Sequence, residues 1–241
     1  VNLVVADPTR GSGAITLAAT PAIKELGVSS RGRIFEIDPK IEYMITPPRM
    51  HLYMEYSCKV YKVFLEFIAK EDIHVYSIDE VFLDVTQYLK TYGMTARELA
   101  SRIATEILEK KGLTATAGIG TNLYLCKVAM DIVAKHKDPD ENGVRVAALN
   151  ECRYRKLLWN HKPLTDFWRV GKGYEKRLHK LGIDTMGKLC TFSLEHEDVL
   201  FKTFGVNAEL LIDHAWGYEP CTMEDIKAYK PEKNSIGSGQ V

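Results

Sequence analysis

The sequence lacks the long apolar runs and the leader that would place it in or across a membrane. No stretch approaches the roughly 18 apolar residues of a membrane-spanning helix. No charged-then-apolar segment opens the chain, so nothing in it indicates secretion. Internal repeats and low-complexity segments are also missing. We therefore predict a cytoplasmic globular protein with no membrane partner.

Cysteine is sparse and unclustered. The five cysteines are widely scattered and form no CxxC pair: Cys58, Cys126, Cys152, Cys190 and Cys221. An odd number without metal-ligand spacing indicates reduced thiols rather than disulfides or zinc ligands. We expect each of them to pack as a small hydrophobic side chain.

An excess of either charge is also absent. The 32 basic and 32 acidic residues cancel, which argues against a nucleic-acid-binding protein as far as total charge is concerned. The local distribution differs, because residues 150–190 contain ten Lys or Arg against four acids. This segment is a candidate surface for a phosphate backbone. The alternative is a solvated helical face without a ligand.

The acidic pair Asp79-Glu80 is the most informative feature present. It lies in residues 76–86, YSIDEVFLDVT, between apolar segments with strand propensity. Adjacent carboxylates repel each other and lose solvation when they are partly buried, and a bound divalent cation removes that cost. Mg²⁺ prefers carboxylate and phosphate oxygens, so the pair indicates metal-dependent phosphoryl or nucleotidyl transfer. The alternative is a solvated turn, in which Asp is common.

The pattern of apolar residues predicts an α+β domain followed by a helical part. Up to about residue 150 the expected order is strand 2–6, strand 14–19, helix 21–26, helix 50–69, strands 73–76 and 81–85, helix 95–111, strand 113–119, helix 123–135 and strand 143–149. Thr95 and Glu98 form a predicted capping box, and Gly112 ends that helix. Long helices on one face of a mostly antiparallel sheet would give the α+β class.

The predicted helix 123–135 carries charges on one face. Lys127, Asp131 and Lys135 follow one another at intervals of four residues. Lys135 falls in the last turn, where it either complements the helix dipole or contacts a triphosphate.

A glycine-rich turn lies within the basic segment. Val170, Gly171, Lys172 and Gly173 precede an amphipathic helix in the pattern of a helix-hairpin-helix element. Such glycines let backbone N–H groups approach DNA phosphates, and the helix N-terminus favours anions. Lys172, Lys176 and Arg177 would add cationic contacts that do not read sequence. The alternative is a helix pair that binds no ligand.

Four motifs in this order resemble the Y-family translesion DNA polymerases, most closely the bacterial UmuC/ImpB-type branch. They are Ser77-Ile78-Asp79-Glu80, Gly118-Ile119-Gly120-Thr121-Asn122, Val133-Ala134-Lys135 and Val170-Gly171-Lys172-Gly173. The resemblance runs over nearly all of the chain. It implies template-directed DNA synthesis across damaged bases.

The resemblance also implies roles for individual residues. Asp79 is similar to the second metal-binding catalytic Asp of the family, and Glu80 to its neighbouring Glu, with two Mg²⁺ ions roughly 4 Å apart. Lys135 and Lys24 stand where the family contacts the triphosphate of the incoming nucleotide, whereas Pro21 replaces a Tyr with the same role. The implied partners are primer-template DNA, deoxynucleoside triphosphates and the sliding clamp, the last through a C-terminal part.

The resemblance implies the subdomains as well. Residues 1–10 and 50–149 would be the palm, 11–49 the fingers, 150–222 the helix-hairpin-helix thumb and 223–241 a linker toward a little finger. The opening VNLVVADP reads as a strand inside a domain, and the family's first catalytic Asp and its little finger do not occur. We therefore expect a truncated, nearly inactive fragment.

Two other functions compete with this hypothesis. One is a non-catalytic, polymerase-like DNA-binding protein. The other is a nucleotide cyclase, which shares the carboxylate hairpin but has no use for the element at residues 170–173.

Overall fold

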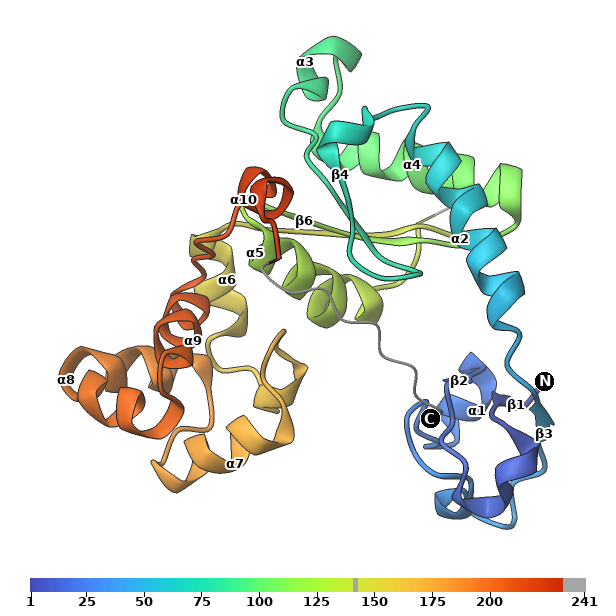
Figure 1. Cartoon of the computed structure of the whole chain (residues 1–241), viewed down its shortest axis with the longest axis horizontal. Coiled ribbons are helices and arrows are strands. Elements are labelled where there is room, and N and C mark those ends of the chain that lie inside the picture. Colours follow the sequence, from blue (N-terminus) through green and yellow to red (C-terminus); the bar gives the residue numbers. More distant parts are fainter. Residues whose placement is uncertain (141–142, 232–241) are drawn as a thin grey trace. The chain divides into compact units, whose positions relative to one another are not determined.

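The computed structural model describes residues 1–140 and 143–231. These residues form two compact units, one built from residues 1–56 and the other from residues 57–230. The division falls inside α2 (Met50–Phe64), and both units are drawn in Figure 1. Of the predicted linker 223–241, only the part before residue 232 is described, and it contains α10 (Met223–Ala228). The rest of that predicted linker lies outside the described residues.

The first unit contains a three-stranded sheet. β1 (Leu3–Val5) is its middle strand and pairs antiparallel with β2 (Ala18–Ala19) and parallel with β3 (Met44–Thr46). The helical segments are η1 (Pro8–Gly13), α1 (Pro21–Glu25) and η2 (Ile34–Glu36). Because β1 is the middle strand, residues 1–10 pack with residues 11–49, whereas the sequence analysis grouped them with residues 50–149.

The second unit begins with helices packed against a hairpin. β4 (Ile73–Val75) and β5 (Val81–Leu83) pair antiparallel, as predicted. α2 and α4 (Ala96–Lys111) share a core that consists of Val63, Phe67, Ile68, Ile73, Leu99, Ile103 and Ile107. The predicted capping box is confirmed, since Thr95 and Glu98 exchange hydrogen bonds at the start of α4. η3 (Lys70–Asp72) and α3 (Tyr88–Tyr92) complete this part.

A second pair of strands holds the next helix in place. β6 (Thr116–Gly120) and β7 (Arg145–Leu149) are parallel. The reason is the crossover between them, because α5 (Leu123–Val128), η4 (Ala129–Val133) and η5 (Ala134–His136) return the chain to the starting edge. Alternation along β6 sends Ala117 and Ile119 toward α4 and the glycines toward α5, so helices cover both faces (Figure 1).

The α+β class is confirmed, with one difference in how the strands are arranged. The described strands form three small sheets that include two parallel pairs, rather than one mostly antiparallel sheet with helices on one face. No described helix is long and apolar enough to cross a lipid bilayer. All five cysteines carry free thiols, but the expected packing role fits only Cys190, which is buried, and Cys126, which is partly buried; the other three are exposed, namely Cys58, Cys152 and Cys221.

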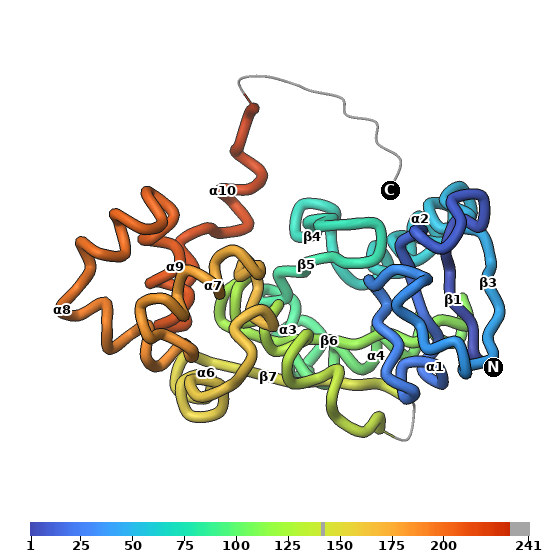
Figure 2. Tube along the Cα trace, turned by 90° about the horizontal axis from the view of Figure 1, so that it is seen from below, coloured from blue at the N-terminus to red at the C-terminus, as the bar shows by residue number. Residues whose placement is uncertain are grey.

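The last part of the second unit is helical, as predicted. Its helices lie together at the left of Figure 2. They are α6 (Glu151–Leu158), the short η6 (Leu164–Asp166), α7 (Lys172–Lys180), α8 (Met186–Phe204) and α9 (Asn207–Trp216). One continuous core joins them to α5, with Tyr124 and Leu125 packed among residues such as Tyr154, Leu178 and Leu211. The helices of the basic segment, residues 150–190, therefore share one hydrophobic core with α5, the helix that contains Lys127.

Candidate catalytic and DNA-binding site

The acidic pair lies in the tight turn between β4 and β5. The backbone N–H groups of Tyr76 and Ser77 both donate to the carbonyl oxygen of Glu80, at 3.0 and 3.1 Å, and this closes the turn. Ser77 Oγ donates to Asp79 Oδ1 at 2.7 Å. The Asp79 side chain is exposed, whereas Glu80 is partly buried. The turn therefore presents one open carboxylate and one carboxylate that faces the protein.

Glu80 is paired with a lysine of α5. Lys127 Nζ lies 2.7 Å from both Glu80 carboxylate oxygens and 2.8 Å from Asp131 Oδ2. Asp131 also pairs with Lys135 at 2.6 Å. These four side chains alternate in sign from the turn along α5, η4 and η5, so the predicted charged face is confirmed. The ion pair between Lys127 and Glu80 was not predicted.

Burial and pairing act in opposite directions on these groups. Burial alone would lower the pKa of Lys127, but hydrogen bonds to Asp131 and Glu80 outweigh it and hold the pKa above its ordinary value. Burial alone would raise the pKa of Asp131, but hydrogen bonds from Lys127 and Lys135 keep it below its ordinary value. These directions favour the charged forms of both Lys127 and Asp131.

Local sequence places Lys127 at the turn. A Cβ on Gly118 would lie 2.0 Å from the Cys126 carbonyl oxygen, and one on Gly120 would lie 2.5 Å from the Cys126 nitrogen. Only glycine allows this close approach of β6 and α5. Asn122 caps α5 by accepting from the Leu125 N–H at 2.8 Å. The motif Gly118–Asn122 thus has a packing role that directs Lys127 toward Glu80.

The side chains at the turn fit a divalent cation in part. Carboxylate oxygens are the ligands that Mg²⁺ prefers, and Asp79 presents such oxygens to solvent. Both Glu80 oxygens already accept from the Lys127 ammonium, so a cation would bind Asp79 first. Within the part of the chain that the structure describes, no group of three or more His, Cys, Asp or Glu side chains could hold a metal.

The two predicted triphosphate contacts lie in different units. Lys24 is exposed on α1 of the first unit. Lys135 belongs to the second unit, and its side chain is 49% exposed beside Asp131. The role of either lysine toward a nucleotide stays a prediction.

The glycine turn is open to solvent. Gly171 is the N-cap of α7, and Gly171, Lys172 and Gly173 are all exposed. A Cβ on either glycine would meet nothing within 4 Å, so packing inside the chain does not require glycine there. Lys176 is likewise exposed on the next turn of α7.

Arg177 differs from the lysines beside it. Its guanidinium lies 4.7 Å from the Tyr174 ring centroid and 4.6 Å from that of Phe204. Its Nη1 donates to the Thr203 carbonyl at 2.9 Å, and its Nε donates to Gly173. The sequence grouped Arg177 with the DNA-contacting residues, and the structure shows that its cation binds α8 and the start of α7.

A model of the family described as impB/mucB/samB matches residues 2–131. The putative UV-damage repair protein UvrX of Bacillus subtilis (strain 168) is 34% identical over 90% of this chain and 49% of its own length. DNA polymerase IV 2 of the same organism is 32% identical over 98% of this chain and 54% of its own length. The chain thus spans about half the length of these relatives.

Solved structures give the same result. The insertion ternary complex of Dbh DNA polymerase matches with a TM-score of 0.71 and 26% identity, over 91% of this chain and 61% of that one. DinB from Sulfolobus solfataricus matches with a TM-score of 0.69 and 27% identity over the same shares. The resemblance inferred from the sequence motifs is confirmed, and this chain belongs to the impB/mucB/samB family, with the fold of the Y-family DNA polymerases.

Proposed function

We propose that this chain is part of the catalytic core of a DNA polymerase that copies damaged templates. The observation that carries the proposal is the turn with Asp79 and Glu80, which lies in the same compact unit as the exposed glycine turn at residues 171–173. A turn with carboxylates is suited to phosphoryl chemistry, and an exposed glycine turn beside lysines is suited to a DNA backbone.

Asp79 is the proposed ligand of Mg²⁺, and Glu80 joins it when the Lys127 ammonium is displaced from one of its oxygens. When bound, the ions would activate the primer 3′-hydroxyl and offset charge on the leaving pyrophosphate. Lys135 is the proposed contact for the nucleotide triphosphate, because its partly exposed ammonium provides a point charge. Lys24 is proposed for the same phosphates on sequence resemblance alone.

The proposed DNA contacts are the backbone at Gly171, Lys172 and Gly173, together with the Lys176 side chain. We propose that residues 57–149 act as the palm and residues 150–222 as the thumb, with the first unit as the fingers. The substrates would be primer-template DNA and deoxynucleoside triphosphates. A cytoplasmic location and contact with a sliding clamp belong to the same proposal.

One observation favours a second candidate, a polymerase-like protein that binds DNA without catalysis. Both carboxylate oxygens of Glu80 already accept from Lys127. If this pairing keeps Glu80 from a metal ion, the turn would bind Mg²⁺ only weakly and would not support catalysis. A nucleotide cyclase is less favoured, since it would leave the exposed glycine turn without a use.

Primer extension with Mg²⁺ and deoxynucleoside triphosphates tests the proposal. It is run with this chain and with the longest natural protein that contains it, each as wild type and as Asp79→Asn. We expect template-dependent extension by the longer protein and its loss in the variant. DNA binding without extension by either wild type supports the second candidate, and equal extension by wild type and variant refutes the role of Asp79.

A further inference from the structure

A hydrogen bond connects the glycine turn to the acidic turn. Trp168 Nε1 donates to Tyr76 Oη at 3.0 Å, although 92 positions separate the two residues in the chain. The rings also meet edge to face, with centroids 5.8 Å apart at 78°. Trp168 precedes Gly171 by three residues, and Tyr76 precedes Asp79 by three. The contact therefore joins the acidic turn to the segment that leads into the glycine turn.

Tyr76 is part of the acidic turn itself. Its backbone N–H donates to the Glu80 carbonyl at 3.0 Å, and the next residue, Ser77, binds both that carbonyl and the Asp79 carboxylate. Its ring also lies 5.9 Å from Lys127 Nζ, the ammonium that holds Glu80. A displacement of the Tyr76 ring would therefore move both acids and their counter-charge.

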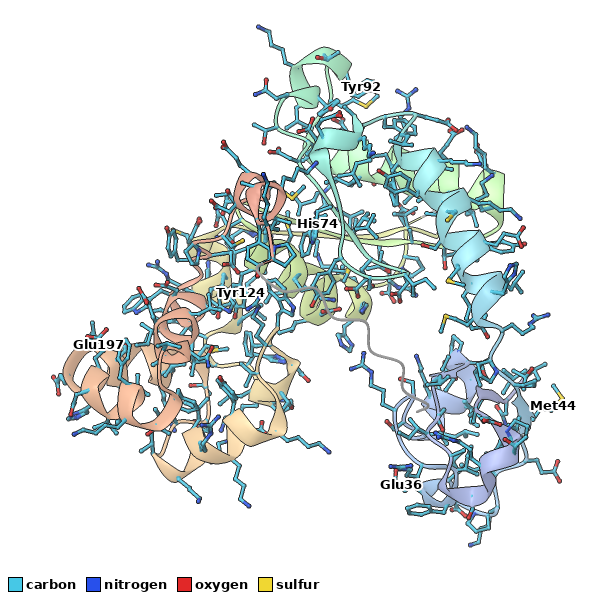
Figure 3. The ribbon with its side chains drawn as sticks, viewed as in Figure 1. Glu36, Met44, His74, Tyr92, Tyr124 and Glu197 are labelled. Carbon is cyan, nitrogen blue, oxygen red and sulfur yellow. The ribbon has the colours of Figure 1, made fainter. Side chains whose placement is uncertain are left out.

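Trp168 is held from the opposite side. Its neighbours Phe167 and Val170 are buried in the helical core. Its ring is parallel to that of His214, with centroids 6.0 Å apart, and His214 stacks on Tyr124 at 4.1 Å. Tyr124 extends from α5 and is labelled in Figure 3. These stacked rings fix the indole against the protein core.

The backbone after Trp168 is also constrained. Arg169 has a φ of 67°, a conformation that non-glycine residues rarely adopt. Its guanidinium lies 4.9 Å from the Trp168 ring centroid. A residue held in such a conformation requires support from its surroundings, and strain of this kind concentrates at functional sites. The segment from Trp168 to the glycine turn is thus held in one specific conformation.

We propose that Trp168 and Tyr76 are a positioning pair that transmits DNA binding at residues 171–173 to the acidic turn. The inference rests on the proposed function and extends it. DNA that orders the glycine turn would fix the indole, and the indole would then fix the closed form of the turn at residues 76–80. Coupling of this kind requires that DNA bind more tightly when the acidic turn is closed than when it is open. By the same factor, bound DNA then favours the closed turn over the open one.

Amide hydrogen exchange of the intact chain, with and without a short DNA duplex, tests the pair. The reporters are the Tyr76 and Ser77 amides, which both donate to Glu80. We expect saturating DNA to slow their exchange about fivefold, at the low end of measured couplings between sites. Strand β6 serves as the internal reference. Fluorescence anisotropy of a labelled duplex measures DNA binding separately.

Two conservative variants remove the hydrogen bond and keep an aromatic ring at each position. Trp168→Phe deletes the donor, and Tyr76→Phe deletes the acceptor but keeps the ring. In each variant we expect DNA to bind with nearly unchanged affinity and no longer to slow exchange at the turn. The double variant should match either single one, because both remove one interaction. Trp159→Phe is the matched control, since it deletes an indole hydrogen bond to the Ala215 carbonyl rather than to Tyr76, and should keep the DNA effect.

The outcomes separate the two proposals. If no duplex binds, the proposed function fails, and this inference fails with it. If DNA binds the wild type without slowing the reporters, or slows them equally in Trp168→Phe, the inference alone is overturned.

Discussion

The Lys127 ammonium lies 2.7 Å from each carboxylate oxygen of Glu80, with Asp131 as its second partner at 2.8 Å. The Lys127 side chain is only 10% exposed, and that of Glu80 is 24% exposed. Charges removed from water to this extent lose solvation, which close partners must replace. The ammonium group of Lys127 thus holds the acidic turn against α5.

Lys127→Met should lower the free energy of unfolding by about 2 kcal/mol, because Glu80 and Asp131 would lose their shared partner while partly buried. Urea unfolding at neutral pH measures the change. Lys135→Met is the matched control, since Lys135 also pairs with Asp131 but is 49% exposed. It should cost less than about 1 kcal/mol, as exposed ion pairs do. Equal losses in both variants would contradict a special role for Lys127.

Asp131 should make stability depend on pH in the acid range. Its pKa is held below the ordinary value of 3.8 because the hydrogen bonds from Lys127 and Lys135 outweigh the effect of burial. A depressed pKa in the folded state contributes stability that is fully present above the unfolded-state pKa and is lost as the pH falls through the folded-state pKa. The stability difference between wild type and Asp131→Asn should therefore be constant above about pH 5 and shrink toward pH 3.

Urea midpoints between pH 6 and pH 3 measure this trend. Asp198→Asn is the control, since Asp198 pairs with Lys202 on the surface with 67% of its side chain exposed. Because exposed ion pairs contribute little to stability, that variant should change the urea midpoint little. A difference for Asp131→Asn that grows as the pH falls would contradict the assignment.

The sequence predicted the elements of this site better than their contacts. The hairpin, the capped α4 and the charged face of α5 follow from local periodicity and capping, which act over a few residues. The pairing of Glu80 with Lys127 depends on how β6 and α5 pack, and so it could not be derived from spacing. The parallel pairing of β6 with β7 was missed for the same reason. The contact of Arg177 with Phe204 was not predicted, because Phe204 lies on another helix.

Gly118→Ala should destabilise the fold by about 3 kcal/mol or prevent folding, because the new Cβ would meet backbone atoms that cannot rotate away. Gly171→Ala is the control. Gly171 has a φ of −90° and open space around it, so stability should be nearly unchanged. Thermal unfolding followed by circular dichroism compares the two variants. A stable Gly118→Ala protein would contradict the close packing of β6 against α5.

Variants of Arg177 and of the lysines Lys172 and Lys176 should affect stability and DNA binding separately. Arg177→Ala removes a guanidinium packed on two rings and bonded to two carbonyls, and should cost about 1–2 kcal/mol of stability. Lys172→Gln with Lys176→Gln should leave stability unchanged and weaken DNA binding. If both lysines contact phosphates, the slope of log affinity against log salt should fall in magnitude by about 1.8. An unchanged slope would exclude these lysines from the DNA contact.

Gly173→Ala should move stability and DNA affinity in opposite directions. Gly173 is the second residue of α7, its φ is not positive, and a Cβ there meets nothing within 4 Å, so alanine should stabilise the fold by about 0.4–1 kcal/mol by restricting the unfolded chain. Stability should therefore rise. If a DNA backbone approaches this turn closely, the added methyl group would hold it away, and affinity should fall although no charge has changed. Urea unfolding and anisotropy on one protein preparation measure both quantities. A stabilised variant that binds DNA as tightly as wild type would show that the glycine serves no backbone contact, and the lysines alone would then have to explain binding.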